Sequence, residues 1–206
     1  MFRFLGHKKD ITRSNKWIFG TMLVFATMGL IASFVLTIEK FHVLTDPQAV
    51  LSCSFNAVLD CSVVMKTWQS SVFGFPNMLI GLMAYPVVIT VAVAGLSGIR
   101  FPRPFLVAAT VCYFLGLVFA YWLFFQSLYA IEVLCPWCLV VTFSTTMIFT
   151  AMSQYILREN TFGVSKVHNK VIQKYLQKDI SKLVTASWIM LMIALVFIKF
   201  GEALFV

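Results

Sequence analysis

Long apolar runs separated by short polar segments dominate the chain. Each run consists chiefly of Leu, Val, Ile, Phe, Ala and Met and is close to the roughly 20 residues that a helix needs to cross a bilayer. The five runs cover residues 17–38, 76–96, 104–129, 136–157 and 183–205. The first is too long for the core of a signal peptide and lacks an Ala-x-Ala-like cleavage site, so we predict a helix there as well. The pattern predicts an all-α integral membrane protein with one five-helix domain, 17–206, after a basic tail, 1–16.

Composition and charge support a membrane protein and indicate its orientation. Hydrophobic residues make up 60% of the chain and charged residues 12%, against about 25% charged residues in soluble domains. The net charge of +8 does not indicate nucleic-acid binding, because the basic residues lie between the apolar runs. Thirteen of the 16 Lys and Arg residues fall in 1–16, 97–103 and 158–182, and the others are Lys40, Lys66 and Lys199. The positive-inside rule therefore places the N-terminus in the cytoplasm and residues 39–75 outside.

Residues 39–75 form the only long exterior loop predicted, and they contain Cys53 and Cys61. Apolar residues recur at three and four over 56–68, which predicts a short amphipathic helix at the interface, with Trp68 at headgroup depth. Cys61 falls on the apolar face of this helix, whereas Cys53, in a Ser-Cys-Ser segment, is expected to be more exposed to water. The basic loop 158–182 also shows helical spacing and predicts an amphipathic helix on the cytoplasmic leaflet.

Residues 73–77 read Phe-Gly-Phe-Pro-Asn. Gly74 and Pro76 suit a turn that re-enters the bilayer, with Pro76 at the first helical position. Asn77 is costly in a membrane helix unless it has a partner. Two interpretations are open: contact of a helix-terminal side chain with headgroups, or a hydrogen bond within a buried ligand site. Cys112, in the third helix, is interpreted as a packing residue because no other cysteine is expected at its depth.

Cys135-Pro136-Trp137-Cys138 opens the fourth helix. Pro136 suits the first helical position, so Cys135 lies near the cap, where backbone N–H groups and the helix dipole favour a thiolate. Cys138 lies three residues further in, roughly 4.5 Å deeper at 1.5 Å per residue. A lipid-soluble redox molecule could therefore reach Cys138, and a protein thiol could reach Cys53. Cys61 and Cys135 are placed to pass electrons between the two pairs.

Two cysteine pairs on an oxidising exterior face indicate thiol–disulfide exchange. A four-cysteine structural zinc site is one alternative, but the seven-residue gap between Cys53 and Cys61 is loose for zinc and the exterior is oxidising. We therefore predict no metal. A second alternative is a pair of static structural disulfides without turnover.

These residues resemble the vitamin K epoxide reductase family, specifically its bacterial members that form disulfide bonds. The matching features are Cys53 and Cys61 in the first exterior loop, Ser62 after the second of them, the run 73–77 and the Cys-x-x-Cys of helix four. The resemblance covers roughly 17–157 and looks closest to the actinobacterial branch. The competing DsbB family of quinone-linked oxidases has its close and wide cysteine pairs in the reverse order.

The resemblance implies a four-helix bundle around a quinone site, plus a fifth helix. It assigns the reaction with quinone to Cys138, the interchange disulfide to Cys135 and Cys61, and exchange with an outside partner to Cys53. It also implies menaquinone or ubiquinone as electron acceptor, without metal. Residues expected near the quinone are Ser62, Ser70, Phe73, Asn77, Trp137 and Thr142. Thr142 stands where the family has a tyrosine.

The implied protein is a thiol–disulfide oxidoreductase of the bacterial cytoplasmic (inner) membrane. It would oxidise a thioredoxin-fold, DsbA-like protein on the exterior. Many bacterial relatives carry such a domain fused after helix five, and since this chain ends at Val206, we expect a separate partner. Quinone or vitamin K epoxide reduction is the alternative activity. A non-enzymatic membrane scaffold with structural disulfides is the alternative class, which retained function after replacement of all four cysteines by serine would favour.

Overall fold

The computed structural model describes residues 2–46, 51–54, 56, 58–161 and 180–201. Five of its helical segments are long and apolar enough to cross a membrane: Asn15–Thr45, Met78–Leu96, Arg103–Ile131, Pro136–Arg158 and Leu183–Phe200. The prediction of an all-α membrane fold with five spanning helices is therefore confirmed. Residues 162–179, where a cytoplasmic amphipathic helix is expected, and 202–206 lie outside the described residues.

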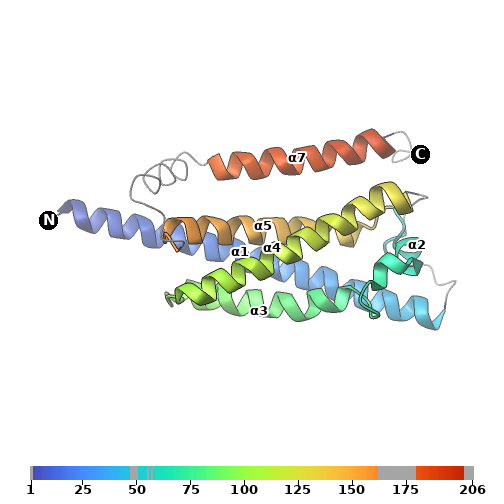
Figure 1. The fold of residues 1–206 in the computed structure, drawn as a ribbon, viewed down its shortest axis with the longest axis horizontal. Coiled ribbons are helices and arrows are strands. Elements are labelled where there is room, and N and C mark those ends of the chain that lie inside the picture. The colour runs from blue at the N-terminus through green and yellow to red at the C-terminus, as the bar shows by residue number, and fades with distance from the viewer. Residues whose placement is uncertain (1, 47–50, 55, 57, 162–179, 202–206) are drawn as a thin grey trace.

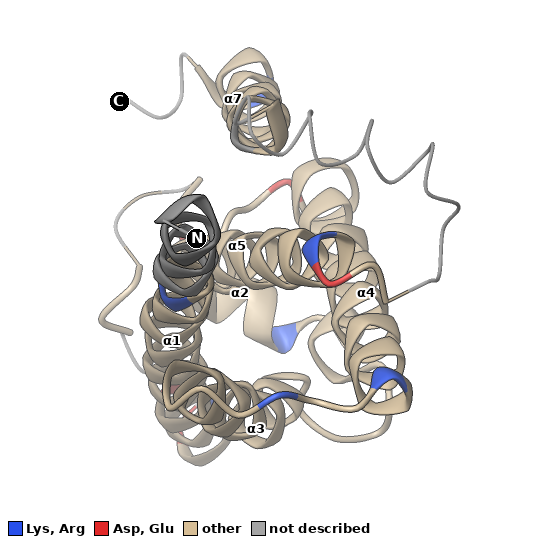
Figure 2. Cartoon of the chain, turned by 90° about the vertical axis from the view of Figure 1, so that its left-hand side faces the viewer, with Lys and Arg blue, Asp and Glu red and all other residues tan. Residues whose placement is uncertain are grey.

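Four of the long helices are arranged in a ring, and the fifth lies outside it (Figures 1 and 2). Helix α1 (Phe2–Thr45) packs along α3 (Met78–Leu96) and α5 (Pro136–Arg158), and α4 (Arg103–Gln126) packs along α5. Helices α3 and α4 make few close approaches, and α7 (Ile180–Phe200) approaches the ring mainly at α5. Close helix packing therefore leaves the ring least closed between α3 and α4.

Helix α1 is longer at both ends than the predicted 17–38 and takes in the expected tail 1–16. Glu39 and Lys40, which were expected to end it, lie within it. Both charges have partners: Glu39 accepts from the backbone N–H and the hydroxyl of Ser52, and Lys40 donates to the Met65 carbonyl at 2.6 Å. The helix stops shortly before Pro47, whose ring disfavours helical backbone in the residue that precedes it.

The other boundaries differ from the predictions by a few residues. Helix α3 begins at Met78 rather than at Pro76, because Pro76 lies in a tight turn that accepts the Leu79 N–H. Helix α4 ends at Gln126 and passes into a π-helical turn, η2 (Ser127–Ile131), before the short connection to α5. Helix α5 starts at Pro136 as predicted.

We call the end of the bundle that contains the start of α5 the cysteine end. It also holds α2 (Cys61–Lys66) and a 3₁₀ turn, η1 (Trp68–Ser71), so a short helix lies in the predicted segment 56–68 but covers only part of it. Helix α2 starts late because extended Asp60 caps it, its side chain accepting from the backbone N–H of Ser62, and it stops where Thr67 becomes extended. Cys61 is fully buried, as expected of the apolar face.

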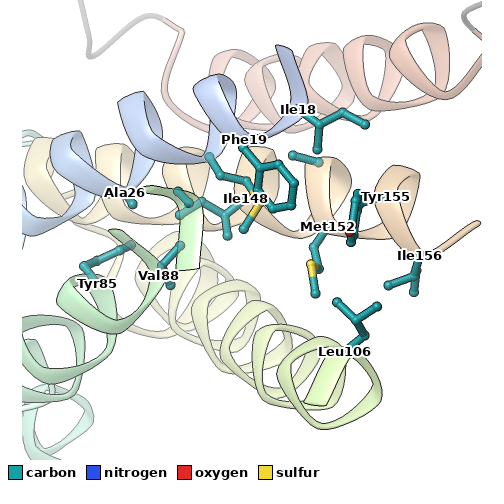
Figure 3. Packing of buried hydrophobic residues seen from close by; sticks show 13 residues of the cluster. Ile18, Phe19, Ala26, Tyr85, Val88, Leu106, Ile148, Met152, Tyr155 and Ile156 are labelled. Carbon is teal, nitrogen blue, oxygen red and sulfur yellow. The ribbon is translucent and has the colours of Figure 1, made fainter. Parts of the chain in front are cut away.

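A cluster of buried apolar side chains fills the half of the bundle away from the cysteine end (Figure 3). Phe19 of α1 lies beside Tyr155 of α5 and Phe101, with ring centroids 4.8 and 6.2 Å away. Lipid chains are as apolar as these side chains, so close packing, rather than removal from water, stabilises this region in a membrane. The cluster consists of Ile18, Phe19, Met22, Ala26, Tyr85, Val88, Ala92, Leu106, Ile148, Ala151, Met152, Tyr155 and Ile156.

Glycines let α1 and α3 approach each other closely. A Cβ on Gly29 of α1 would overlap the ring of Tyr85, and a Cβ on Gly81 of α3 would overlap the hydroxyl of Ser33. Small residues at such crossings are typical of membrane helices. The approach carries the Tyr85 hydroxyl to α5, where it lies 3.0 Å from Oγ1 of Thr145. Tyr85 of α3 therefore packs against α1 with its ring and contacts α5 with its hydroxyl.

Polar contacts hold α7 beside the ring. The indole N–H of Trp188 donates to the Tyr121 hydroxyl at 2.8 Å, and that hydroxyl lies 2.9 Å from Oγ1 of Thr146. Near the cysteine end, the Lys199 ammonium lies 2.6 Å from the carboxylate of Glu132. Glu132 has a left-handed backbone (φ 58°) in the connection to α5. Helix α7 therefore contacts the segment that leads into Cys135.

The opposite end of the bundle is basic. Arg100 lies in the connection between α3 and α4, Arg103 begins α4, and Arg158 ends α5. Figure 2 looks onto this end and shows basic segments around its rim. Arg100, Arg103 and Arg158 therefore lie at the end of the bundle opposite Cys53, Cys61, Cys135 and Cys138.

Candidate active site

Backbone pairing sets the register between the two cysteine pairs. Leu134 forms a parallel bridge with the segment before α2: its N–H donates to the Val58 carbonyl at 2.7 Å, and its carbonyl accepts from the Asp60 N–H at 3.1 Å. Cys61 and Cys135 each follow directly on one of these paired residues. The pairing therefore brings the start of α2 against the start of α5, although the two cysteines are 74 residues apart.

The sulfur atoms of Cys53, Cys61 and Cys135 lie next to one another, with that of Cys61 in the middle. Cys53 and Cys61 form a disulfide of 2.10 Å, and Sγ of Cys61 lies 3.1 Å from Sγ of Cys135. Cys135 and Cys138 are free thiols. Disulfides exchange when a thiolate attacks one sulfur of the bond, and reacting atoms about 3–3.5 Å apart are in a near-attack position. Cys135 is thus placed to exchange with the Cys53–Cys61 disulfide.

The start of α5 favours the thiolate form of Cys135. Cys135 is the N-cap, with extended backbone, and Pro136 is the first helical residue, as the sequence predicts. A hydrogen bond from the Cys138 thiol lowers the pKa of Cys135, and the backbone N–H groups of Cys138 and Trp137 add to this effect. Burial and the nearby charge of Asp60 act in the opposite direction. Since the thiolate is the nucleophile, a lowered pKa increases the reactive fraction at neutral pH.

Cys53 is not the water-exposed cysteine that the sequence suggested. It is 1% exposed, as buried as Cys61 and Cys135. The reason is the unpredicted extension of α1, whose Val43 joins the wall around the disulfide. The buried residues of this cluster are Leu36, Val43, Leu51, Cys53, Cys61, Met65 and Cys135.

Two carboxylates anchor the serines that flank Cys53. Oδ1 of Asp60 accepts from the Ser54 hydroxyl at 2.5 Å and from the Ser62 N–H at 2.7 Å. Glu39, which is buried, accepts from Ser52. Burial would raise the pKa of Asp60, but hydrogen bonds from Ser54, Ser62 and the next backbone N–H outweigh it and hold that pKa below its usual value. Asp60 is therefore ionised at neutral pH.

A cavity of about 370 Å³ lies inside the ring of α1, α3, α4 and α5. Cys135 and Cys138 line it at the cysteine end, and Ile148 lines it deeper along α5. At 1.5 Å per residue, that stretch of α5 is roughly 20 Å long. The volume is within the range of pockets for small molecules, and most of the lining side chains are apolar. The cavity therefore suits an elongated apolar ligand that reaches the Cys138 thiol.

The residues predicted to contact a quinone divide into two groups. Those that line the cavity are Ser70, Asn77 and Thr142. Those outside its lining are Ser62, Phe73 and Trp137. Phe73 is 58% exposed and packs on Phe119 of α4, with ring centroids 5.4 Å apart. Thr142 donates its hydroxyl to the Cys138 carbonyl at 3.0 Å.

Asn77 shapes the loop that closes the cavity at the cysteine end. Its Nδ2 donates to the Gln69 carbonyl at 2.6 Å, its Oδ1 accepts from the Val72 N–H at 3.2 Å, and its own N–H donates to the Ser70 carbonyl at 2.9 Å. The loop turns at Gly74, which has a φ of 81° that favours glycine. Both ends of the Asn77 amide are thus used within the loop, which neither sequence interpretation anticipated.

The cavity has its mouth on the side between α3 and α4. Val87 of α3 and Cys112 and Gly116 of α4 both line the cavity and lie exposed on the bundle surface. In a bilayer this surface faces lipid. Cys112, interpreted from the sequence as a packing residue, is therefore exposed at this mouth.

The sequence reasoning missed the polar residues that support the cysteines. Asp60 directly precedes Cys61, and an acidic residue just before a short amphipathic segment is a recognisable N-cap signal. Lys40 donates to Met65 and Ser70, and so ties α1 to both α2 and η1. No local pattern identifies this role, because the partners lie 25 and 30 residues away.

Among the described residues, no three His, Cys, Asp or Glu side chains gather where they could hold a metal ion. A free thiol in contact with a disulfide, next to an apolar cavity within five spanning helices, defines a multi-pass membrane oxidoreductase that works through cysteines. A family model described as the Vitamin K epoxide reductase family matches residues 21–153, and the chain belongs to that family. A comparison with curated proteins gives no match.

Proposed function

We propose that this protein is a quinone-dependent thiol–disulfide oxidoreductase that oxidises a separate, exterior, DsbA-like thioredoxin-fold protein and so supports disulfide formation in exported proteins. The contact of 3.1 Å between Cys61 and Cys135 carries the proposal. It connects a disulfide in the loop with a thiol pair whose second member, Cys138, lines an apolar cavity. A relay to a lipid-soluble acceptor needs both features.

The proposed relay has three exchanges. The partner's dithiol reduces Cys53–Cys61 and leaves as a disulfide. The Cys61 thiolate attacks Cys135 of an oxidised Cys135–Cys138 pair, and Cys138 leaves as a thiolate. Cys53 then attacks Cys61, which restores the loop disulfide and leaves Cys135 reduced. The described state, with Cys53–Cys61 bonded and the other two cysteines as thiols, corresponds to the end of this sequence.

The remaining step returns Cys135 and Cys138 to a disulfide. Their two thiols give up two electrons and two protons, which convert one quinone to one hydroquinone, so the step balances without another reactant. Menaquinone or ubiquinone would enter from lipid through the mouth between α3 and α4. The ring would lie next to Cys138, and Ser70 and Thr142 would line the space around it.

The basic end of the bundle supports an orientation with the cysteine end on the exterior of a bacterial cytoplasmic membrane. Cysteine labelling tests this orientation in a background without the native cysteines. We expect Trp68→Cys to react with an impermeant maleimide in intact cells and Ser97→Cys to react only after lysis. The reverse pattern would place the site in the reducing cytoplasm and overturn the proposed oxidase.

Anaerobic titration of the reduced protein with menaquinone and ubiquinone analogues tests the reaction. We expect loss of two thiols for each quinone reduced. Cys138→Ser should abolish quinone reduction, whereas Cys135→Ser leaves the Cys138 thiolate beside the quinone and should give a new visible absorbance band. A band that survives Cys138→Ser and disappears in Cys135→Ser would reverse the assignment, and thiol loss without quinone reduction would refute the function.

A further inference from the structure

We infer that Asp60 is a positioning residue that keeps Cys53 beside Cys61 while the disulfide between them is open. The inference rests on the proposed relay, in which that disulfide opens and closes once in each cycle. Cys53 must return to Cys61 before the relay can continue, and an open nine-residue loop could move it away.

The hydrogen bonds of Asp60 make this role possible. Its Oδ1 accepts from Ser54 and from Ser62, the residues that directly follow Cys53 and Cys61. No sulfur takes part in these bonds, so reduction of the disulfide does not break them. Asp60 therefore joins the same two chain segments as the disulfide does, but without a covalent bond.

Within the same loop, Asn56 provides a second set of such bonds. Its Oδ1 accepts from the N–H groups of Val58 and Leu59, at 3.1 and 2.8 Å. These bonds shape the segment between the two cysteines, and they too are independent of sulfur. The loop is thus held at its base by Asp60 and near its middle by Asn56.

Cys61 can form a disulfide with Cys53 or with Cys135. Asp60 positions Cys53 through its side chain and Cys135 through its backbone. Cys135 is brought to Cys61 by the backbone bond from the Asp60 N–H to the Leu134 carbonyl, which any residue except proline at position 60 can make. Cys53 is held by the carboxylate through Ser54. Loss of the carboxylate should therefore loosen Cys53 and leave Cys135 in place.

The step affected is the resolution of the interchange disulfide. The Cys53 thiolate attacks Sγ of Cys61, the Cys61–Cys135 bond breaks, and the electron pair goes to Cys135, which takes up a proton. A Cys53 that spends less time near Cys61 resolves this bond less often. The balance between the Cys61–Cys135 and Cys53–Cys61 disulfides then shifts toward the first.

A Cys138→Ser background makes this balance measurable. Without Cys138, Cys135 competes only with Cys53 for the disulfide with Cys61. The protein is oxidised, equilibrated, quenched in acid and alkylated, and peptide mass spectrometry gives the ratio of free Cys53 to free Cys135. We expect Ser54→Ala and Asp60→Ala to raise this ratio about tenfold, as for loss of one hydrogen bond to a charged group. Asp60→Asn keeps the acceptor oxygen and should stay within about twofold of the background.

Thr67→Val is the matched control. It removes a hydroxyl that donates to Val64 at the other end of α2, and it should leave the ratio unchanged. An unchanged ratio in Ser54→Ala would overturn the inference even if Asp60→Ala fails to fold. An equal shift in Asp60→Asn and Asp60→Ala would overturn it too, since charge alone would then be responsible. Failure of the relay itself is seen separately: Cys53→Ser/Cys138→Ser would then form no Cys61–Cys135 disulfide.

Discussion

Sγ of Cys135 lies 3.1 Å from Sγ of Cys61, although Cys61 already shares a disulfide with Cys53. The approach is held by backbone hydrogen bonds on both sides of Leu134, not by a covalent bond. A disulfide and an attacking thiol can therefore stay in contact whichever pair of sulfurs is bonded. This arrangement is suited to repeated exchange, whereas a static structural disulfide does not require a third cysteine beside it.

Single cysteine substitutions should separate the two halves of the relay. In Cys61→Ser, the free Cys53 thiol attacks the disulfide of the oxidised DsbA-like protein and one partner thiol is released. The resulting mixed disulfide should accumulate because Cys61 can no longer resolve it. Cys135→Ser should leave the loop pair reduced, without accumulation of that adduct. Non-reducing electrophoresis of cells that express both proteins measures the adduct. Equal trapping by the two variants would contradict the proposed order of exchange.

Asn77→Ala should weaken the loop that closes the cavity. The substitution removes the donor to Gln69 and the acceptor for Val72, and at about 0.5–1.5 kcal/mol for each hydrogen bond we expect a loss of about 1–3 kcal/mol in stability. Because the loop borders the cavity, the KM for quinone should rise as well. Thermal unfolding in detergent and steady-state kinetics measure the two effects.

Asn77→Asp is the control for this loop. It keeps an acceptor for the Val72 N–H but sets a carboxylate oxygen against the Gln69 carbonyl, so it should lose at least as much stability as Asn77→Ala if the donor to Gln69 holds the loop. A parent-like unfolding temperature for Asn77→Ala would show that these hydrogen bonds do not hold the loop.

The spanning helices could be predicted from the sequence because about 20 consecutive apolar residues are required by bilayer thickness alone. The ends of α1 could not. Glu39 and Lys40 look like a boundary in the sequence, yet their charges are satisfied by Ser52 and Met65, which lie outside the helix in the chain. The burial of Cys53 follows from that same extension of α1, so one long-range effect accounts for both errors.

In the site, residue types were easier to predict than contacts. Pro136 and the spacing of Cys135 and Cys138 indicate the cap and the depth order, because these depend on one helix. Phe73 and Asn77 depend on how a loop folds over other helices. Phe73 turns toward Phe119, and Asn77 bonds to its own loop, and neither arrangement is encoded in the spacing of residues.

Gly29→Ala should force α1 and α3 apart. The added methyl group would overlap the Tyr85 ring, and overpacking of this kind costs about 1–3 kcal/mol. Gly20→Ala is the matched control on the same helix, because a Cβ there meets nothing within 4 Å. Thermal unfolding of the two variants in the same detergent tests the difference. Equal unfolding temperatures would mean that the close crossing is not needed for stability.

The contact between Glu132 and Lys199 should make the position of α7 depend on pH. The hydrogen bond from Lys199, together with its positive charge, lowers the pKa of Glu132 below its usual value of 4.5. A lowered pKa in the folded state means that the ion pair contributes stability above the unfolded pKa and loses it as the pH falls through the folded one. We therefore expect the end of α7 to separate from the start of α5 as the pH falls below 4.5.

Spin labels at position 130 and at the exposed position 198 of α7 would measure this separation as a distance over a pH titration. Both side chains of the pair are partly exposed, so added salt should weaken the contact at neutral pH as well. Glu132→Gln removes the titrating group and should show the longer distance at every pH. If the parent protein and Glu132→Gln give the same distance at pH 7, the ion pair does not hold α7 against the segment that leads into Cys135.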